Sequence, residues 1–212
     1  MTIPVARSSK EFETALLKAA LPKLTRMGMQ KRAHWIFTCA LAPEAIGWLS
    51  FPSRLDRSEV HIMMSVNVGV RHQTLERTLA ELEGEKFHAY HPPSMMTSLD
   101  SLMPRRAFPS WVFTNETDNA ALLNDVISCI EKYGLAFMRD HTGLDSIVET
   151  GYQFQSRESR AYRVPVAYFL MGESEKVRES LNETLESIAD RDDFWAQGFR
   201  KFAANLSTRM HD

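Results

Sequence analysis

The sequence contains few cysteines, glycines and prolines. Its 212 residues include two Cys, nine Gly and nine Pro. Cys39 and Cys129 have neither the spacing of a CxxC redox motif nor that of a zinc framework. Small secreted domains are usually much richer in cysteine, so we expect two reduced thiols. The low content of Gly and Pro excludes a low-complexity or collagen-like chain.

Long apolar runs are also missing. No stretch approaches the roughly 18 apolar residues that a membrane span requires. The first twenty residues lack a basic region followed by an apolar one, which a secretory signal would have. We therefore expect a cytoplasmic protein without membrane contacts.

The common catalytic motifs are missing as well. The sequence has no GxSxG elbow, no P-loop, no GxGxxG loop and no HExxH pair. Cys39 lies on the apolar face of an expected strand, where burial disfavours the reactive thiolate. Zinc sites usually have three or four ligands with recognisable spacing, more than His88 and His91 supply. We predict no catalytic residue, no cofactor and no metal site.

The composition is that of a folded chain with nearly balanced charge. The sequence is 44% apolar and 25% charged, with a net charge of -2. This composition excludes a disordered chain. Residues 7–32 have a local excess of basic residues, but the sequence pI of about 6.4 argues against a nucleic-acid-binding protein. We predict no nucleic-acid partner.

The first half of the chain predicts a helix followed by strands. Ser8 and Glu11 have the spacing of a capping box, and apolar residues then recur at helical steps up to Gly28, with Pro22 as a possible break. Residues 34–39 and 45–51 read as strands. Residues 59–71 alternate so regularly that we expect one long strand with one apolar and one polar face. A helix over 74–83, an irregular loop over 84–109 and a strand over 110–114 complete this half.

From residue 115 onward the apolar period is helical. We expect helices that begin near Thr117, Thr142, Ser156 and Glu173, and a last one capped by Asp190 or Asp192. Gly134 is expected to end the first of them. The predicted fold class is α+β, with a small antiparallel sheet of three to four strands and flanking helices, followed by a helical C-terminal half. Residues 1–114 form the sheet half and 115–212 the helical half, expected to be one compact unit.

The polar face of the long strand and the irregular loop hold the most varied side chains of the chain. Antiparallel sheets often have one solvated polar face without a function, but a long loop within a compact domain is usually functional or mobile. The candidate partner-binding residues on these two segments and on the first strand are His34, His61, Ser65, Asn67, Arg71, His88, Tyr90 and His91.

The sequence is compatible with three functions. The first is a non-enzymatic protein-binding module, for example one of the toxin-immunity type. The second is a small-molecule enzyme that uses His61, His88 or His91 as acid or base near Arg71, because imidazole titrates near neutrality. The third is a structural module that associates with itself through the C-terminal aromatic residues over 194–202. Arginines at positions 157, 160 and 163 are a further hint of a partner, since positive charge is unfavourable near a helix start.

The order of several short motifs resembles a bacterial family of domains of unknown function, the DUF forty-three-oh-four type. The motifs are Met27-Gly28-Met29, Lys31-Arg32, His34-Trp35-Ile36-Phe37, Val66-Asn67-Val68-Gly69-Val70, Trp111-Val112-Phe113, Lys132-Tyr133-Gly134-Leu135 and Leu170-Met171-Gly172. Met29 departs from the aromatic residue that the family prefers after the first glycine. The resemblance implies no catalytic residues, and it implies an association with toxin and immunity loci.

The near-neutral total hides an uneven distribution of charge. Residues 1–112 carry a net charge of +4 and residues 113–212 one of -6. We expect the two halves to be electrostatically complementary, and a basic partner to prefer the second half.

Overall fold

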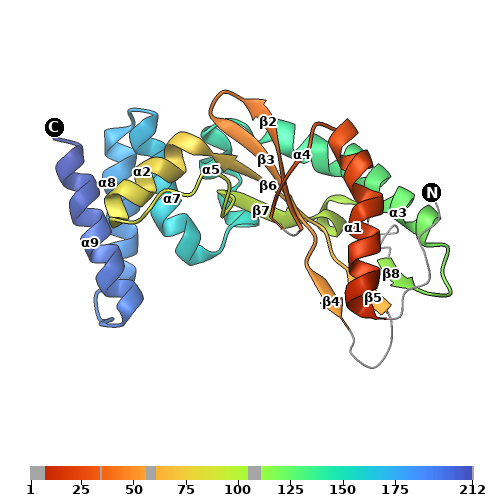
Figure 1. Cartoon of the computed structure of the whole chain (residues 1–212). Coiled ribbons are helices and arrows are strands. Elements are labelled where there is room, and N and C mark those ends of the chain that lie inside the picture. Colours follow the sequence, from red (N-terminus) through yellow and green to blue (C-terminus); the bar gives the residue numbers. More distant parts are fainter. Residues whose placement is uncertain (1–7, 34, 56–60, 105–110, 212) are drawn as a thin grey trace. The chain divides into compact units, whose positions relative to one another are not determined.

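A computed structural model of the chain describes residues 8–33, 35–55, 61–104 and 111–211. The fold is α+β, as predicted, and the second half of the sequence is helical (Figure 1). Residue contacts group the chain into two units, Met1–Gly69 with Met96–Asp140, and Val70–Met95 with His141–Asp212. Each unit thus joins segments from both sides of residue 114, where the predicted halves meet.

The first unit begins with the expected capped helix. Helix α1 (Ser9–Arg26) starts where the hydroxyl of Ser8 accepts a hydrogen bond from the backbone N–H of Glu11 at 3.2 Å. Pro22 lies inside α1 without dividing it, and Gly28 follows its end with a positive φ of 81°. The apolar face of α1, with Phe12, Leu16 and Leu24 among its residues, is fully buried.

Two sheets replace the single small sheet that the sequence predicts. The larger has five strands in the order β1-β2-β3-β6-β7, and the smaller has three in the order β4-β5-β8. The strands are β1 (Gln30–Ala33), β2 (Ile36–Ala42), β3 (Ala45–Ser50), β4 (Ser53–Leu55), β5 (His61–Met64), β6 (Asn67–His72), β7 (Met95–Ser98) and β8 (Trp111–Thr114). Strands β2 and β3 pair antiparallel, with Phe37 opposite Leu49.

The prediction of one long strand over 59–71 is wrong. The chain leaves the extended ladder at Ser65 and Val66, so β5 belongs to the smaller sheet and β6 to the larger one. The predicted polar face is wrong as well, because every residue of β6 after Asn67 is buried. A strand covered on both faces hides its polar side chains, and alternation alone does not reveal this. The segment 84–109 is also more regular than expected, since it contains β7 and a 3-10 turn, η1 (Leu99–Leu102).

Gly134 does not end a helix, contrary to expectation. Helix α3 (Asn119–Cys129) passes through a π-helical turn, η2 (Ile130–Gly134), into α4 (Leu135–Asp140). A Cβ atom at Gly134 would lie 3.1 Å from Cγ1 of Val68 and 3.5 Å from Cδ1 of Leu99. The glycine therefore permits a close approach of the helical segment to its neighbours.

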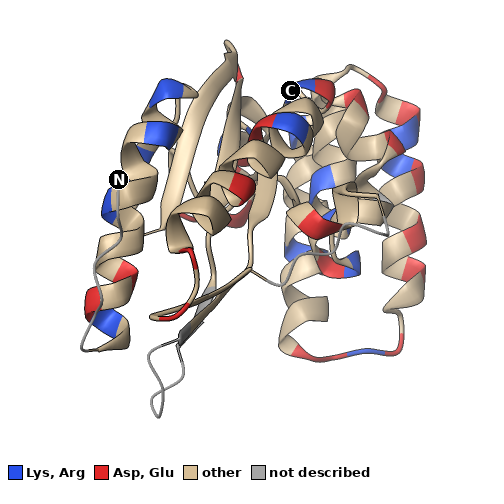
Figure 2. Ribbon diagram, turned by 90° about the vertical axis from the view of Figure 1, so that its right-hand side faces the viewer, with Lys and Arg blue, Asp and Glu red and all other residues tan. Residues whose placement is uncertain are grey.

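The second unit is mainly helical. It contains α2 (Gln73–Glu83), α5 (Asp145–Glu149), α6 (Gly151–Phe154), α7 (Arg157–Leu170), α8 (Ser174–Ser187) and α9 (Phe194–Arg209). Ser156 caps α7 as predicted, whereas α9 is capped by Asp193 and not by Asp190 or Asp192. Basic and acidic positions are interspersed along these helices (Figure 2). Within the described part of the chain, no helix is long and apolar enough to cross a membrane.

The predicted aromatic stripe of α9 faces the interior of its own unit. Phe199 and Phe202 are buried and surround the ring of Tyr162, with centroid distances of 5.3 Å and 4.8 Å. Phe194 is the exception, because 94% of its surface is exposed. The stripe thus contributes mainly to the core, as helical aromatic stripes usually do.

Candidate functional site

The eight predicted site residues are divided between the two units. His34 lies outside the described residues, and His61 lies in β5. Ser65, between β5 and β6, is exposed, and Asn67 is half-buried at the start of β6; both belong to the first unit. The remaining four belong to the second unit and lie close together. They are Arg71, His88, Tyr90 and His91.

Arg71 is at the centre of a buried charge network. Its side chain is only 2% exposed, and Nη1 lies 3.3 Å from Oε2 of Glu76. The same carboxylate accepts two hydrogen bonds from Arg163, at 2.7 Å from Nε and 3.1 Å from Nη2. Burial lowers the pKa of Arg71, and the nearby Glu76 carboxylate opposes this shift. One buried carboxylate therefore neutralises two guanidinium groups only in part.

The carbonyl groups of the loop that follows α2 accept hydrogen bonds from both terminal nitrogens of Arg71, whereas its buried Nε has no hydrogen-bond partner among the described residues. Its Nη2 donates to the carbonyl of His88 and its Nη1 to the carbonyl of Pro92. The side chain of Gln73 donates to the carbonyl of Ala89 at 2.8 Å. Backbone carbonyls bonded to a buried guanidinium have little freedom to move. Residues His88–Pro92, which we call the clamped loop, are thus held against the start of α2.

The clamped loop presents an aromatic cluster to solvent. His88 and His91 are exposed and Tyr90 is half-buried. The His88 ring stands edge-on to Tyr90 at 4.8 Å and to His91 at 6.4 Å between centroids. Partial burial, together with the positive charges of His88 and Arg71, lowers the pKa of His91. The lowered pKa favours the neutral form of His91, and the cluster offers ring edges to a partner.

This geometry does not fit the acid–base site expected of an enzyme. Arg71 lies beside the histidines, but its donors are directed at backbone carbonyls and at Glu76. A substrate anion could reach this guanidinium only by displacing bonds that hold the loop. Among the described residues, no group of three or more His, Cys, Asp or Glu side chains could hold a metal ion. Arg71 thus positions the loop, and the outward-facing rings are the groups that can meet a ligand.

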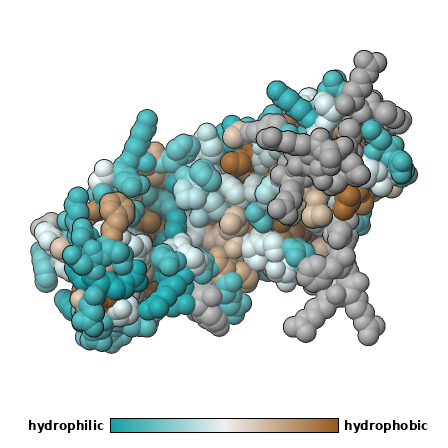
Figure 3. Space-filling model, turned by 90° about the horizontal axis from the view of Figure 1, so that it is seen from below, coloured by the Kyte–Doolittle hydropathy of each residue, from teal (hydrophilic) through white to brown (hydrophobic). Residues whose placement is uncertain are grey.

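A second feature of this unit is a surface groove that sequence reasoning missed. It has a volume of about 460 Å³ and is lined by residues of α7 and α8, together with Val148 of α5 and Trp195 of α9. Its α7 wall consists of Arg157, Arg160, Ala161, Val164 and Tyr168, and its α8 wall of Lys176, Glu179, Ser180, Glu183, Thr184 and Ser187. Seen from below, the surface of this helical part of the chain is predominantly hydrophilic with smaller hydrophobic areas (Figure 3). We call this feature the α7–α8 groove.

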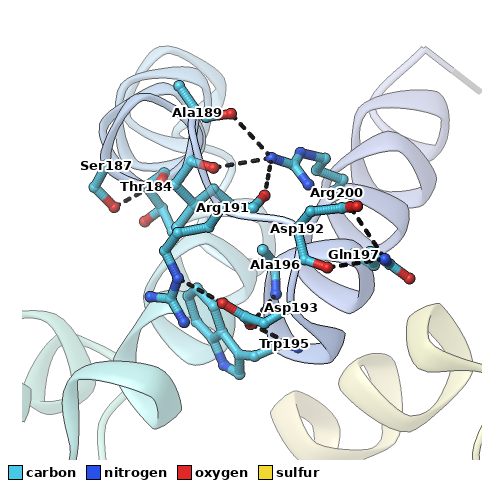
Figure 4. A network of polar contacts seen from close by, with 11 residues as sticks. Thr184, Ser187, Ala189, Arg191, Asp192, Asp193, Trp195, Ala196, Gln197 and Arg200 are labelled. Carbon is cyan, nitrogen blue, oxygen red and sulfur yellow. Dashed lines mark hydrogen bonds and ion pairs between the residues drawn. The ribbon is translucent and has the colours of Figure 1, made fainter.

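The end of the α7–α8 groove at Trp195 is rigidly built (Figure 4). The Trp195 ring stacks on Phe199 at 5.6 Å, and the Arg191 guanidinium lies 5.2 Å from its centroid. Arg191 also donates to Asp193 at 2.7 Å. Arg200 donates to three carbonyls of the segment that follows α8, those of Ile188, Ala189 and Arg191, at 2.8 Å, 3.3 Å and 2.7 Å. The α8–α9 loop is therefore fixed by its own polar contacts.

Helical periodicity already contained part of the signal for this groove. Arg157 and Arg160 lie on the groove face of α7, while Arg163, expected to belong with them, points to Glu76. The half-exposed apolar residues Ala161 and Val164 continue that face. Which face of an amphipathic helix remains open depends on long-range packing, so the groove could not be located from the sequence.

Comparisons with known proteins give no assignment for this chain. No protein-family model matches the sequence, and no curated protein or solved structure matches it significantly. The resemblance to the DUF forty-three-oh-four type therefore stays a prediction.

Proposed function

We propose that this protein is a non-enzymatic binding module that recognises another protein through the clamped loop. The observation that carries the proposal is the bonding of buried Arg71 to the carbonyls of His88 and Pro92. Exposed rings on a loop with a fixed backbone lose little conformational freedom on binding, which favours affinity.

The energetics of the clamp support a role in recognition. Burying two guanidinium groups against one carboxylate is a poor way to gain stability, because desolvation of charges offsets much of their attraction. A hydrophobic cluster of similar volume would often stabilise the unit as well. The network therefore makes most sense as a device that fixes the conformation of the loop.

Charge favours a basic partner. The second unit contains 12 basic and 16 acidic residues, a net charge of -4. Glu83 and Glu85 precede the clamped loop in the sequence, with Lys86 and Phe87 between them and the loop. Steering by opposite charge accelerates encounter with such a partner. The sequence also resembles a family associated with toxin and immunity loci. We therefore propose that the partner is a basic toxin, which the protein neutralises in the cytoplasm.

Affinity capture with matched variants tests the proposal. The wild-type protein and a variant with His88→Ala, Tyr90→Ala and His91→Ala are tagged, expressed in the native host and recovered under identical conditions. Phe194→Ala is the control, because it removes an exposed ring elsewhere in the same unit. We expect one stoichiometric protein with the wild type and the control, and its loss with the triple variant. Recovery of no such protein, or equal recovery with all three baits, contradicts the proposal.

A second variant separates positioning from contact. Arg71→Lys retains a positive charge for Glu76 but loses the planar fork that reaches two carbonyls. We expect faster amide exchange in residues 88–92 and weaker capture of the partner, with little change in far-UV circular dichroism. Unchanged exchange in the clamped loop would remove the role assigned to Arg71.

A further inference from the structure

We infer that the α7–α8 groove binds an extended peptide segment that carries an acidic and a basic group a few residues apart. The inference concerns a site separate from the clamped loop and does not depend on the function proposed for that loop. It is based on the length of the groove, the order of charges along its walls and the hydrogen-bonding groups between them.

The length of the groove fits a short stretch of chain. Its α7 wall extends from Arg157 to Tyr168, which is about 16 Å at the rise of an α-helix. An extended peptide covers that distance with about five residues. The groove is an open trough on the surface of a helical hairpin, so a segment of a longer protein could lie in it without threading.

Charges are ordered along the groove. Helices α7 and α8 are joined by a turn at Gly172 and therefore run in opposite directions, with the Lys176 ammonium 5.4 Å from the Tyr168 ring centroid. Arg157 and Arg160 thus lie toward the Trp195 end. Glu179 and Glu183 lie on the opposite wall, nearer the middle of the groove. An acidic group is favoured at the Trp195 end, and a basic group two or three residues away.

The groove also offers acceptors for the backbone of a peptide. The hydroxyl groups of Thr184 and Ser187 donate to carbonyls of their own helix, at 3.2 Å and 2.8 Å, so their oxygens remain acceptors. Acceptors along the walls suit the N–H groups of an extended chain.

Two other occupants fit less well. A planar ligand such as a nucleobase needs a free aromatic face, and the Trp195 ring already stacks on Phe199 and lies 5.2 Å from the Arg191 guanidinium. A docked helix has no spare backbone N–H groups for the acceptors of the walls, and it needs a wider apolar surface than Ala161 and Val164 of the α7 wall provide. The extended peptide uses the charges, the hydroxyl groups and these two apolar side chains together.

A positional-scanning library of fluorescently labelled pentapeptides with free C-termini tests this inference on the full chain. We expect selection of an acidic residue or the terminal carboxylate at one end and of Lys or Arg two or three positions away. Trp195 supplies a second readout, because Trp35, Trp48 and Trp111 are buried and it is half-exposed. The selected peptide should change its fluorescence.

Charge reversals assign the binding to the groove. Arg157→Glu and Glu183→Lys should each weaken the selected peptide by about tenfold or more, as loss of a close charge pair does. Glu175→Lys and Arg178→Glu alter exposed residues of α8 that do not line the groove, and should leave affinity within about twofold at physiological salt. A library without charge selection, a selected peptide insensitive to both groove variants, or binding only of longer helix-forming peptides would overturn the inference.

Discussion

Replacing Glu76 by glutamine probes the buried charge network directly. The side chain of Glu76 is 5% exposed and faces Arg71 and Arg163, which are 2% and 10% exposed. Glutamine has nearly the same shape, so Glu76→Gln removes the negative charge and leaves two guanidinium groups buried without a counter-ion. Breaking a buried ion pair in this way typically costs about 3–5 kcal/mol. We expect a loss of that size in the free energy of unfolding of the second unit.

The same helix provides the matched control. Glu81 of α2 pairs with Arg209 at 2.8 Å, but these side chains are 51% and 42% exposed. An exposed pair contributes less than about 1 kcal/mol, so Glu81→Gln should have little effect. Urea denaturation followed by circular dichroism, with amide exchange of α2 to identify the unit that unfolds, measures both variants. Equal losses for Glu76→Gln and Glu81→Gln would refute the reasoning, because burial would then not decide the outcome.

Three further predictions concern single residues. Phe199 is buried and Phe194 is 94% exposed. Phe199→Ala should therefore lower the free energy of unfolding by about 3–5 kcal/mol, and Phe194→Ala by less than about 0.5 kcal/mol. Thermal denaturation measures both. Asp193→Ala removes the cap of α9 and should cost about 1 kcal/mol in urea denaturation; no change would mean that water replaces the cap. Burial lowers the pKa of His72, so on acidification the unfolded chain takes up a proton at a higher pH than the folded chain does. The neutral imidazole therefore stabilises the fold fully above about pH 6.5, and the free energy of unfolding declines below that pH. His72→Gln should flatten the change in stability between pH 7 and 5, and an unchanged slope would contradict this.

Local chemistry predicted the elements better than it predicted their arrangement. The hydroxyl of Ser8 and that of Ser156 cap their helices as expected, because a cap needs only residues three positions apart. The break at Ser65 and Val66 carries no such signal: the residues on both sides continue the same alternation. Two strands of different sheets then read as one, and only the pairing partners of each strand reveal the division.

The sequence pointed to part of the candidate site but not to its chemistry. His88, Tyr90 and His91 were identified because they lie in an irregular segment, and they lie together in the structure. Arg71 was expected on a solvated polar face and is buried instead, where its two terminal nitrogens contact Glu76, one turn into α2, and the carbonyls of the clamped loop. Long-range carbonyl partners leave no trace in a single sequence.

The central claim is that the clamped loop is the surface that meets another protein, and site-specific photo-crosslinking tests it most directly. Tyr90→p-benzoylphenylalanine places the crosslinker within the aromatic cluster, and the same substitution at Phe194 places it on an exposed position of α9. After irradiation of intact native-host cells, we expect one additional heavier band with Tyr90 and none with Phe194. The band should weaken when Arg71→Lys is also present. No band at Tyr90, or the same bands from both positions, would contradict the account.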